Sequence, residues 1–260
     1  MQAKRLKMFT ALYAKEMRDL AAETIIVAGL AVVVNLFLFF KLNHTPYAHI
    51  LVLPNLMLLG LAAFLPFISS FKLIYREWKS NTIYMLLSLP VKGALVLGAK
   101  MAALVTNYIA GTLAVLVSSF IVSLALVGEE IQRALQTIHL TPGVSYGQLL
   151  GTGLLFYLLS IAGLIYLVSI SFGSQIVGKL VRGYSGLVTL LVFLALLFTI
   201  QDLGLLVGNE LVSFLGIDFS IQWTIDTFNQ FLLLFIAALL GVSTLIYAGT
   251  VWIYNRRIEL

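Results

Sequence analysis

The chain has 260 residues, of which 61% are hydrophobic and only 10% are charged, whereas a soluble domain carries about 25% charged residues, so we exclude a water-soluble protein. The net charge of +5 comes from Lys and Arg in short segments between apolar runs, which indicates membrane topology rather than nucleic-acid binding. Cysteine is absent, which excludes disulfides, thiolate catalysis and cysteine-based metal sites.

We predict an all-α integral membrane protein with about six transmembrane helices in a single transmembrane domain, 1–260. Crossing about 30 Å of hydrocarbon takes about 20 apolar residues, and such runs recur along the chain. They cover 24–40, 50–71, 100–127, 148–172, 185–200 and 228–254. Because the first run begins only near Thr24, after polar and amphipathic residues, we expect it to remain as a membrane helix rather than be cleaved as a signal peptide.

The N-terminal segment, 1–22, has the pattern of an amphipathic helix. Its apolar residues recur at helical spacing: Leu6, Phe9, Tyr13, Met17 and Leu20. Its basic residues fall on the opposite side: Lys4, Lys7, Lys15 and Arg18. We predict an interfacial helix with its apolar face in lipid and its cationic face toward headgroups, acting either as a membrane anchor or as a partner-binding element.

The segment between spans two and three, 72–90, predicts a second amphipathic helix, on the cytoplasmic side. Its apolar and aromatic residues repeat at i, i+3, i+4 and i+7: Phe71, Ile74, Tyr75 and Trp78. A neighbouring basic face holds Lys72, Arg76 and Lys79. Asn81 interrupts the pattern and Pro90 prevents a continuous helix, so span three must start afresh near Val91 or Gly93. We expect the segment to protrude from the membrane.

Two segments are assigned to the outer side. The first, 128–147, contains Glu129, Glu130 and Arg133 in a sequence typical of a short surface helix. The second, 202–226, is moderately apolar but carries several glycines, so we predict a re-entrant or outer-interface segment.

The distribution of Lys and Arg predicts the orientation. Fourteen of the sixteen lie on one face: five in the N-terminal segment, five between spans two and three, two between spans four and five, and two after span six. Only Lys41 and Arg133 lie on the other face. By the positive-inside rule the rich face is cytoplasmic, which places both termini in the cytoplasm.

Reactive groups are scarce at membrane depth. The three histidines fall in outer segments, and the sequence contains neither an HExxH pair nor a GxxxxGK[ST] loop, so we predict no catalytic, cofactor or metal site. Most spans contain no ionisable side chain, which argues against a proton relay. Mildly polar residues remain as candidates for the lining of a path, or as contacts that pack helices together: Asn35, Thr106, Asn107 and Tyr108.

The order of these parts resembles that of the permease subunit of ATP-binding-cassette exporters of the second type. The local match runs Arg76-Glu77-Trp78-Lys79-Ser80-Asn81-Thr82, then Leu86-Leu87-Ser88-Leu89-Pro90-Val91, with Lys100 downstream. This is similar to the family's pattern of a charged Glu, small polar residues and Leu-Leu-x-x-Pro followed by a lysine. The resemblance covers the layout of the whole chain, but sharp similarity is confined to 71–100.

The resemblance implies that 72–90 is a coupling helix that docks on separately encoded cytoplasmic ATPase subunits. The docking residues would be Tyr75, Arg76, Glu77, Trp78 and Lys79. A second permease, identical or homologous, would complete the path. The chain itself would then be no enzyme, would need no cofactor, and would lie in the plasma membrane.

Two alternatives stay open. The segment 72–90 is also compatible with an ordinary basic inside loop. The whole chain is also compatible with a self-contained secondary carrier or a membrane assembly factor that has no ATPase. Neither the cargo nor the composition of a dimer follows from the sequence, and export rests on the resemblance alone.

Overall fold

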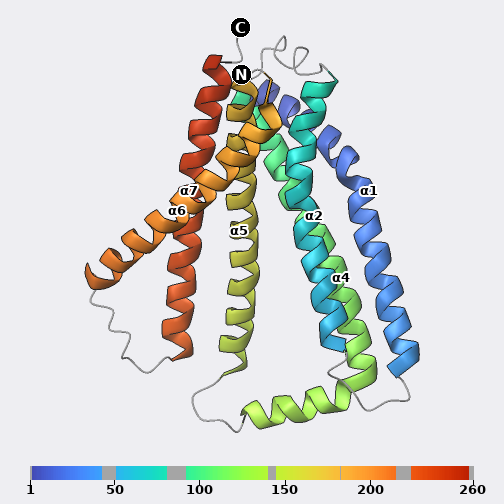
Figure 1. Ribbon diagram of the computed structural model, residues 1–260. Coiled ribbons are helices and arrows are strands. Elements are labelled where there is room, and N and C mark those ends of the chain that lie inside the picture. The colour runs from blue at the N-terminus through green and yellow to red at the C-terminus, as the bar shows by residue number, and fades with distance from the viewer. Residues whose placement is uncertain are drawn as a thin grey trace. The chain divides into compact units, whose positions relative to one another are not determined.

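The computed structural model describes residues 2–42, 51–80, 92–139, 145–181, 183–214 and 224–257. The elements in this part of the chain are helices, shown in Figure 1: α1 (Gln2–Leu42), α2 (Val52–Lys79), α4 (Gly93–His139), α5 (Tyr146–Leu180), α6 (Ser185–Phe214) and α7 (Ile225–Arg257). The predicted all-α class is therefore confirmed.

Five helices are long and apolar enough to cross a membrane. Among the described residues these stretches are Arg5–Leu42, Val52–Lys79, Gly93–Leu126, Tyr146–Leu180 and Ile225–Arg256. Large apolar side chains such as Phe37 and Leu150 are exposed along them, which is unfavourable in water but ordinary for helices in lipid. The remaining apolar stretch, Ser185–Thr199, is shorter, so the sixth span stays a prediction.

The chain forms two compact units. Unit 1 comprises Met1–Leu73 and Ala94–Leu150, and unit 2 comprises Ile74–Gly93 and Gly151–Leu260. Unit 1 therefore contains α1, most of α2 and α4, whereas unit 2 contains the end of α2, most of α5, and α6 and α7. The chain enters unit 2 within α2, and it returns to unit 1 at the start of α4.

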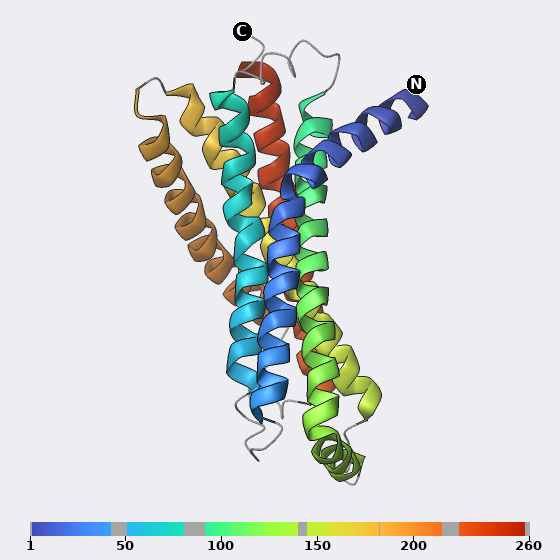
Figure 2. The same ribbon diagram turned by 90° about the vertical axis from the view of Figure 1, so that its right-hand side faces the viewer.

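Helices α1, α2 and α4 pack side by side in unit 1, as Figures 1 and 2 show. One core cluster joins the three helices through Val27, Ala31, Leu58, Ala62 and Val115. Small residues at such positions let helix backbones approach closely, which is how helices associate in lipid.

Helix α1 is continuous across the predicted boundary between the interfacial helix and span one. Figure 2 shows its first turns directed away from the line of the rest of the helix. Tyr13 is half-buried and Leu20 is buried, whereas Lys7, Lys15 and Arg18 are exposed. Leu6, which belongs to the predicted apolar face, is 65% exposed, so the amphipathic character and the interfacial position of this segment stay predictions.

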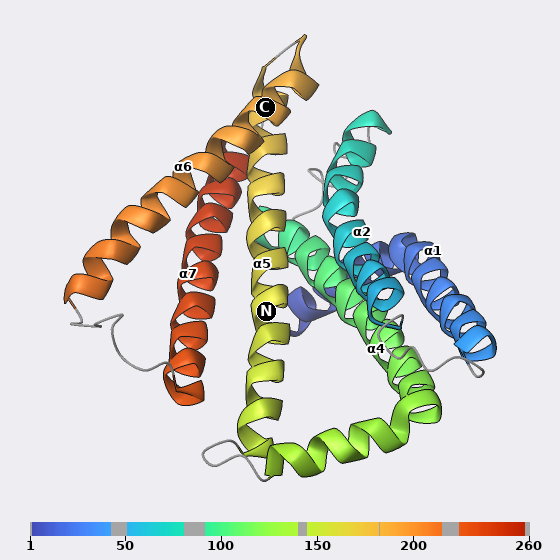
Figure 3. The same ribbon diagram turned by 60° about the horizontal axis from the view of Figure 1, so that its bottom comes forward.

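Helix α4 begins at Gly93, as the helix-breaking Pro90 predicts. It continues to His139, so the backbone of the first predicted outer segment is helical up to this residue. Figures 1 and 3 show these last turns running crosswise to the rest of α4. Residues 140–144 lie outside the described part of the chain.

Helix α6 also extends further than expected, because it continues to Phe214 through Gly204 and Gly208. A helical glycine costs about 1 kcal/mol relative to alanine, but unpaired backbone groups cost several kcal/mol each in lipid, so an apolar sequence keeps its helical bonds there. Half of the predicted outer segment 202–226 is thus helical, and 215–223 lies outside the described residues.

In unit 2, α7 runs beside α5, as Figures 1 and 3 show. The Thr152 hydroxyl of α5 donates a hydrogen bond to Asn229 Oδ1 of α7 over 2.8 Å. At the other end of α5 the chain turns into α6 at Gly183, whose φ of 103° is a conformation that a glycine adopts without strain. This turn brings the end of α5 against the start of α6.

Candidate functional site

The predicted docking residues lie in the last turns of α2. The helix runs without a break from Val52 to Lys79, so the described part of the predicted coupling helix continues span two. Ser80 closes it, because its backbone N–H and its hydroxyl both donate to the Arg76 carbonyl, over 2.9 and 2.8 Å. Residues 81–91 lie outside the described part. We call Ile74–Gly93, the stretch of unit 2 between the two parts of unit 1, the docking segment.

The five predicted docking residues divide between two sides of the helix. Glu77 is 6% exposed and faces inward, and Trp78 is half-buried. Tyr75 is 56% exposed, and Arg76 and Lys79 are also exposed. An aromatic and two cationic side chains are therefore accessible to a partner, whereas the carboxylate is not.

The end of α5 contacts two aromatic side chains of the docking segment. The Lys179 ammonium lies 5.7 Å from the ring centroid of Tyr75 and 5.7 Å from that of Trp78. Both distances are within the range of a cation–π interaction, which contributes about 0.5–2 kcal/mol depending on desolvation. Lys179 thus joins two of the predicted docking residues to α5.

The end of α7 contacts the end of the docking segment at Gly93. The Gly93 backbone N–H donates to Asn255 Oδ1 over 3.2 Å. A side chain at position 93 would collide with α7, because a Cβ there would lie 2.4 Å from Tyr254 Cδ1.

Unit 1 contains an ion pair buried between α1 and α4. Lys100 Nζ lies 2.8 Å from Glu16 Oε1, and the two side chains are 2% and 3% exposed. Lys15, whose side chain is 46% exposed, reaches the same oxygen at 3.5 Å. Glu16 Oε2 has no hydrogen-bond partner among the described residues. Burying a charge costs free energy, so the loss of either partner would leave the other as an uncompensated buried charge.

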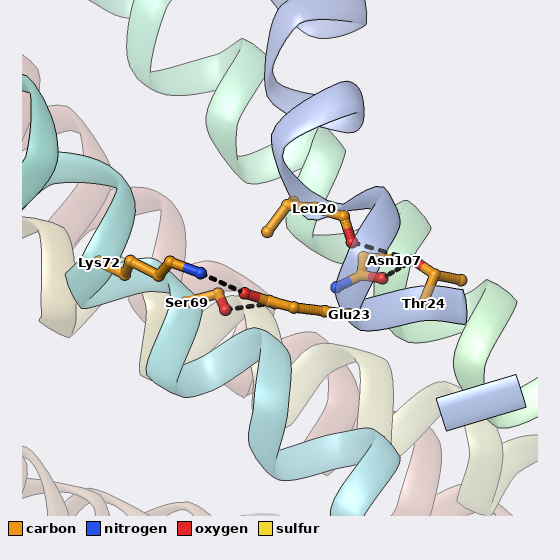
Figure 4. A network of polar contacts seen from close by, with 6 residues as sticks. All are labelled: Leu20, Glu23, Thr24, Ser69, Lys72 and Asn107. Carbon is orange, nitrogen blue, oxygen red and sulfur yellow. Dashed lines mark hydrogen bonds and ion pairs between the residues drawn. The ribbon is translucent and has the colours of Figure 1, made fainter. Parts of the chain in front are cut away.

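A second polar group lies further along α1, as Figure 4 shows. The Glu23 carboxylate accepts a hydrogen bond from the Ser69 hydroxyl of α2. It also forms an ion pair with Lys72 Nζ of α2 at 2.9 Å. Beside it the Thr24 hydroxyl donates to Asn107 Oδ1 of α4. Adjacent residues of α1 therefore connect it to two different helices.

The candidate path residues take part in contacts between helices of unit 1. The Tyr13 hydroxyl donates to Thr106 Oγ1 over 3.0 Å, and Asn35 Nδ2 donates to Ser118 Oγ over 3.2 Å. Asn107 accepts from Thr24, and Tyr108 is 4% exposed. These contacts are those of residues that pack helices together, and a role in lining a path stays a prediction.

Sequence reasoning missed Glu16 and Asn255. Glu16 falls between Tyr13 and Leu20 on the packed side of α1, and an acid within an apolar stripe was the available signal. Asn255 carried no signal, because its partner Gly93 is 162 positions away.

Among the described residues, no group of three or more His, Cys, Asp or Glu side chains is placed to hold a metal ion. The comparisons with known proteins add no assignment, because no family model, no curated protein and no solved structure matches the chain.

Proposed function

We propose that the chain is the membrane-spanning subunit of an ATP-driven exporter. In this proposal it forms the translocation path with a second permease in the plasma membrane, with both termini in the cytoplasm. Separate cytoplasmic ATPase subunits hydrolyse ATP and dock on the predicted coupling segment, 72–90, which overlaps the docking segment. In this proposal the chain changes conformation and forms part of the path, and it catalyses no reaction itself.

The observation that supports the proposal is the place of the docking segment in the fold. Its described residues, 74–80 and 92–93, are assigned to unit 2, whereas the helical stretches joined to it on both sides, Val52–Leu73 and Ala94–His139, belong to unit 1. The α2 helix is unbroken at the boundary. A displacement of this one segment would therefore act directly on helices of both units, as an ATP-driven permease requires.

The exposed side chains indicate what kind of partner would dock. Tyr75, Arg76 and Lys79 present an aromatic ring and two positive charges. Tyr and Arg are enriched among the residues that dominate binding energy, and complementary charge guides association. We therefore expect the ATPase to offer an acidic cleft.

The test is a pull-down of the tagged protein from native membranes, with mass spectrometry of the proteins recovered. The variant Arg76→Ala/Lys79→Ala removes the exposed charges of the docking segment. Its matched control, Lys7→Ala/Arg18→Ala, removes two exposed charges from α1. We expect a stoichiometric P-loop ATPase with wild type and control, and about tenfold less with the variant, as for loss of important interface residues.

The structure adds one observation that favours the alternative of a secondary carrier. Glu16 and Lys100 are ionisable groups buried between helices, and such groups often belong to ion pathways. Transport driven by an ion gradient in proteoliposomes without nucleotide would support the carrier. A chain that is recovered alone, without an ATPase, would exclude the exporter and leave the carrier or an assembly factor.

A further inference from the structure

We infer that Lys179, Tyr254 and Asn255 form a seat that fixes the position of the docking segment. These residues come from the ends of α5 and α7, and all their contacts described above lie within unit 2. The inference rests on the proposed function for its consequence in ATPase docking. Its structural part can be tested without any partner.

The seat contacts the beginning of the docking segment through two aromatic side chains of α2. Glu77, which lies between them in the sequence, is 6% exposed. The Lys179 ammonium lies over the rings of Tyr75 and Trp78. These contacts set the rotation of the last turn of α2 about its axis, and so direct Arg76 and Lys79 outward.

The seat holds the end of the segment through a hydrogen bond that only glycine permits. The Gly93 N–H belongs to the first turn of α4, where backbone donors have no partner within the helix. Asn255 Oδ1 accepts from it over 3.2 Å. A Cβ at this position would lie 2.4 Å from Tyr254 Cδ1 and 2.7 Å from Asn255 Oδ1. Any other residue would therefore force either the Tyr254 and Asn255 side chains or the start of α4 to shift.

The described parts of the docking segment thus contact the ends of two helices: Tyr75 and Trp78 contact Lys179 of α5, and Gly93 contacts Asn255 of α7. These contacts restrict the last turn of α2 and the start of α4 before a partner binds. A displaced docking segment would also move the end of α7 with it. Tyr254 is 6% exposed, so it would act on an ATPase through the docking segment and is a positioning residue.

The seat can be tested with a spin label, because the chain has no cysteine of its own. A Ser80→Cys substitution, at an exposed position, places the label at the end of α2. Thr10→Cys, exposed on α1 of unit 1, places a reference label outside the seat. Each label is combined with Asn255→Ala, with Gly93→Ala, or with Asn229→Ala.

Asn229→Ala is the matched control, because Asn229 also lies on α7 and also accepts a hydrogen bond between helices, from Thr152 over 2.8 Å. We expect Asn255→Ala and Gly93→Ala each to increase the mobility of the label at position 80 severalfold, and to leave the label at position 10 unchanged. We expect Asn229→Ala to change neither label.

Two outcomes would overturn the inference: an unchanged label at position 80 in both seat variants, or an equal increase with Asn229→Ala. The pull-down separates this from the proposed function. If an ATPase is recovered with the wild type, and severalfold less of it is recovered with Asn255→Ala, the result supports both the seat and the proposed function. If the seat variants mobilise the label at position 80 but the wild-type chain recovers no ATPase, the inference about the seat is supported and the exporter function is rejected.

Discussion

Units 1 and 2 pack their helices in different ways. In unit 1, α1 is joined to its neighbours by polar pairs, above all Glu16–Lys100 and Thr24–Asn107. In unit 2, α5 is joined to α6 and α7 where glycine lets another helix approach, as at Gly173 and Gly178. Lipid supplies no hydrophobic force between helices, so association requires either polar contacts or close packing. Unit 1 also packs Ala31 and Ala62 closely, and unit 2 also has the Thr152–Asn229 hydrogen bond, but the ion pairs named above all lie in unit 1.

The two kinds of contact lose different amounts of stability when a residue is changed. A buried ion pair that loses one partner leaves a charge without compensation, and the cost is large. Where two helices approach closely at a glycine, replacing the glycine by alanine adds a methyl group and forces a local shift. The loss of stability is then moderate. Predictions at matched positions in the two units test this difference.

The largest effect is expected from Glu16→Leu, which leaves the buried Lys100 ammonium without this carboxylate. Breaking a buried ion pair costs about 3–5 kcal/mol. The free energy of unfolding in mixed detergent micelles measures the loss. The control is Glu16→Leu/Lys100→Met, which removes both charges and should recover most of the stability. A double variant as unstable as the single one would show that the pair contributes through packing and not through charge.

A moderate effect is expected from Gly178→Ala in unit 2. The new Cβ would lie 2.0 Å from Thr189 Oγ1 and 2.9 Å from the Ser185 carbonyl oxygen, so the start of α6 must shift. Overpacking of this kind costs about 1–3 kcal/mol, measured in the same unfolding assay. Gly163→Ala on the same helix is the control, because its Cβ would meet nothing within 4 Å. Equal effects at the two glycines would contradict the close approach of α6.

The membrane-spanning helices were predictable because lipid imposes a simple rule of apolar length. Pro90 correctly predicted a new helix start near Gly93, since proline removes a backbone donor. The extension of α6 through Gly204 and Gly208 was not predicted, because we treated these glycines as helix breaks, whereas a glycine within a helix costs only about 1 kcal/mol relative to alanine.

The docking site stays a prediction, and the sequence did not predict which side chains of this part of α2 are buried. Spacing along α2 grouped Tyr75 with Trp78 on an apolar side, yet Tyr75 is largely exposed and Glu77 is buried. Glu77 acts electrostatically on Tyr254 of α7, which is far away in the sequence. The ion pair of unit 1 also joins distant parts of the chain, since its two residues are 84 positions apart. Neither contact leaves a local pattern.

The smallest effect is expected at Lys72, whose ion pair with Glu23 is more accessible than Glu16–Lys100. The Lys72 side chain is 57% exposed and that of Glu23 is 15% exposed. Exposed ion pairs contribute about 0–1 kcal/mol and are screened by salt, so Lys72→Ala should cost less than about 1 kcal/mol. The difference between wild type and variant should shrink further in high salt. Ser69→Ala is the comparison, because Ser69 donates to the same carboxylate but is 2% exposed, and its loss should cost more than that of Lys72. If Lys72→Ala were the more costly change, and indifferent to salt, the pair would lie in hydrocarbon rather than at the cytoplasmic interface, and the depth assigned to this part of α2 would have to be revised.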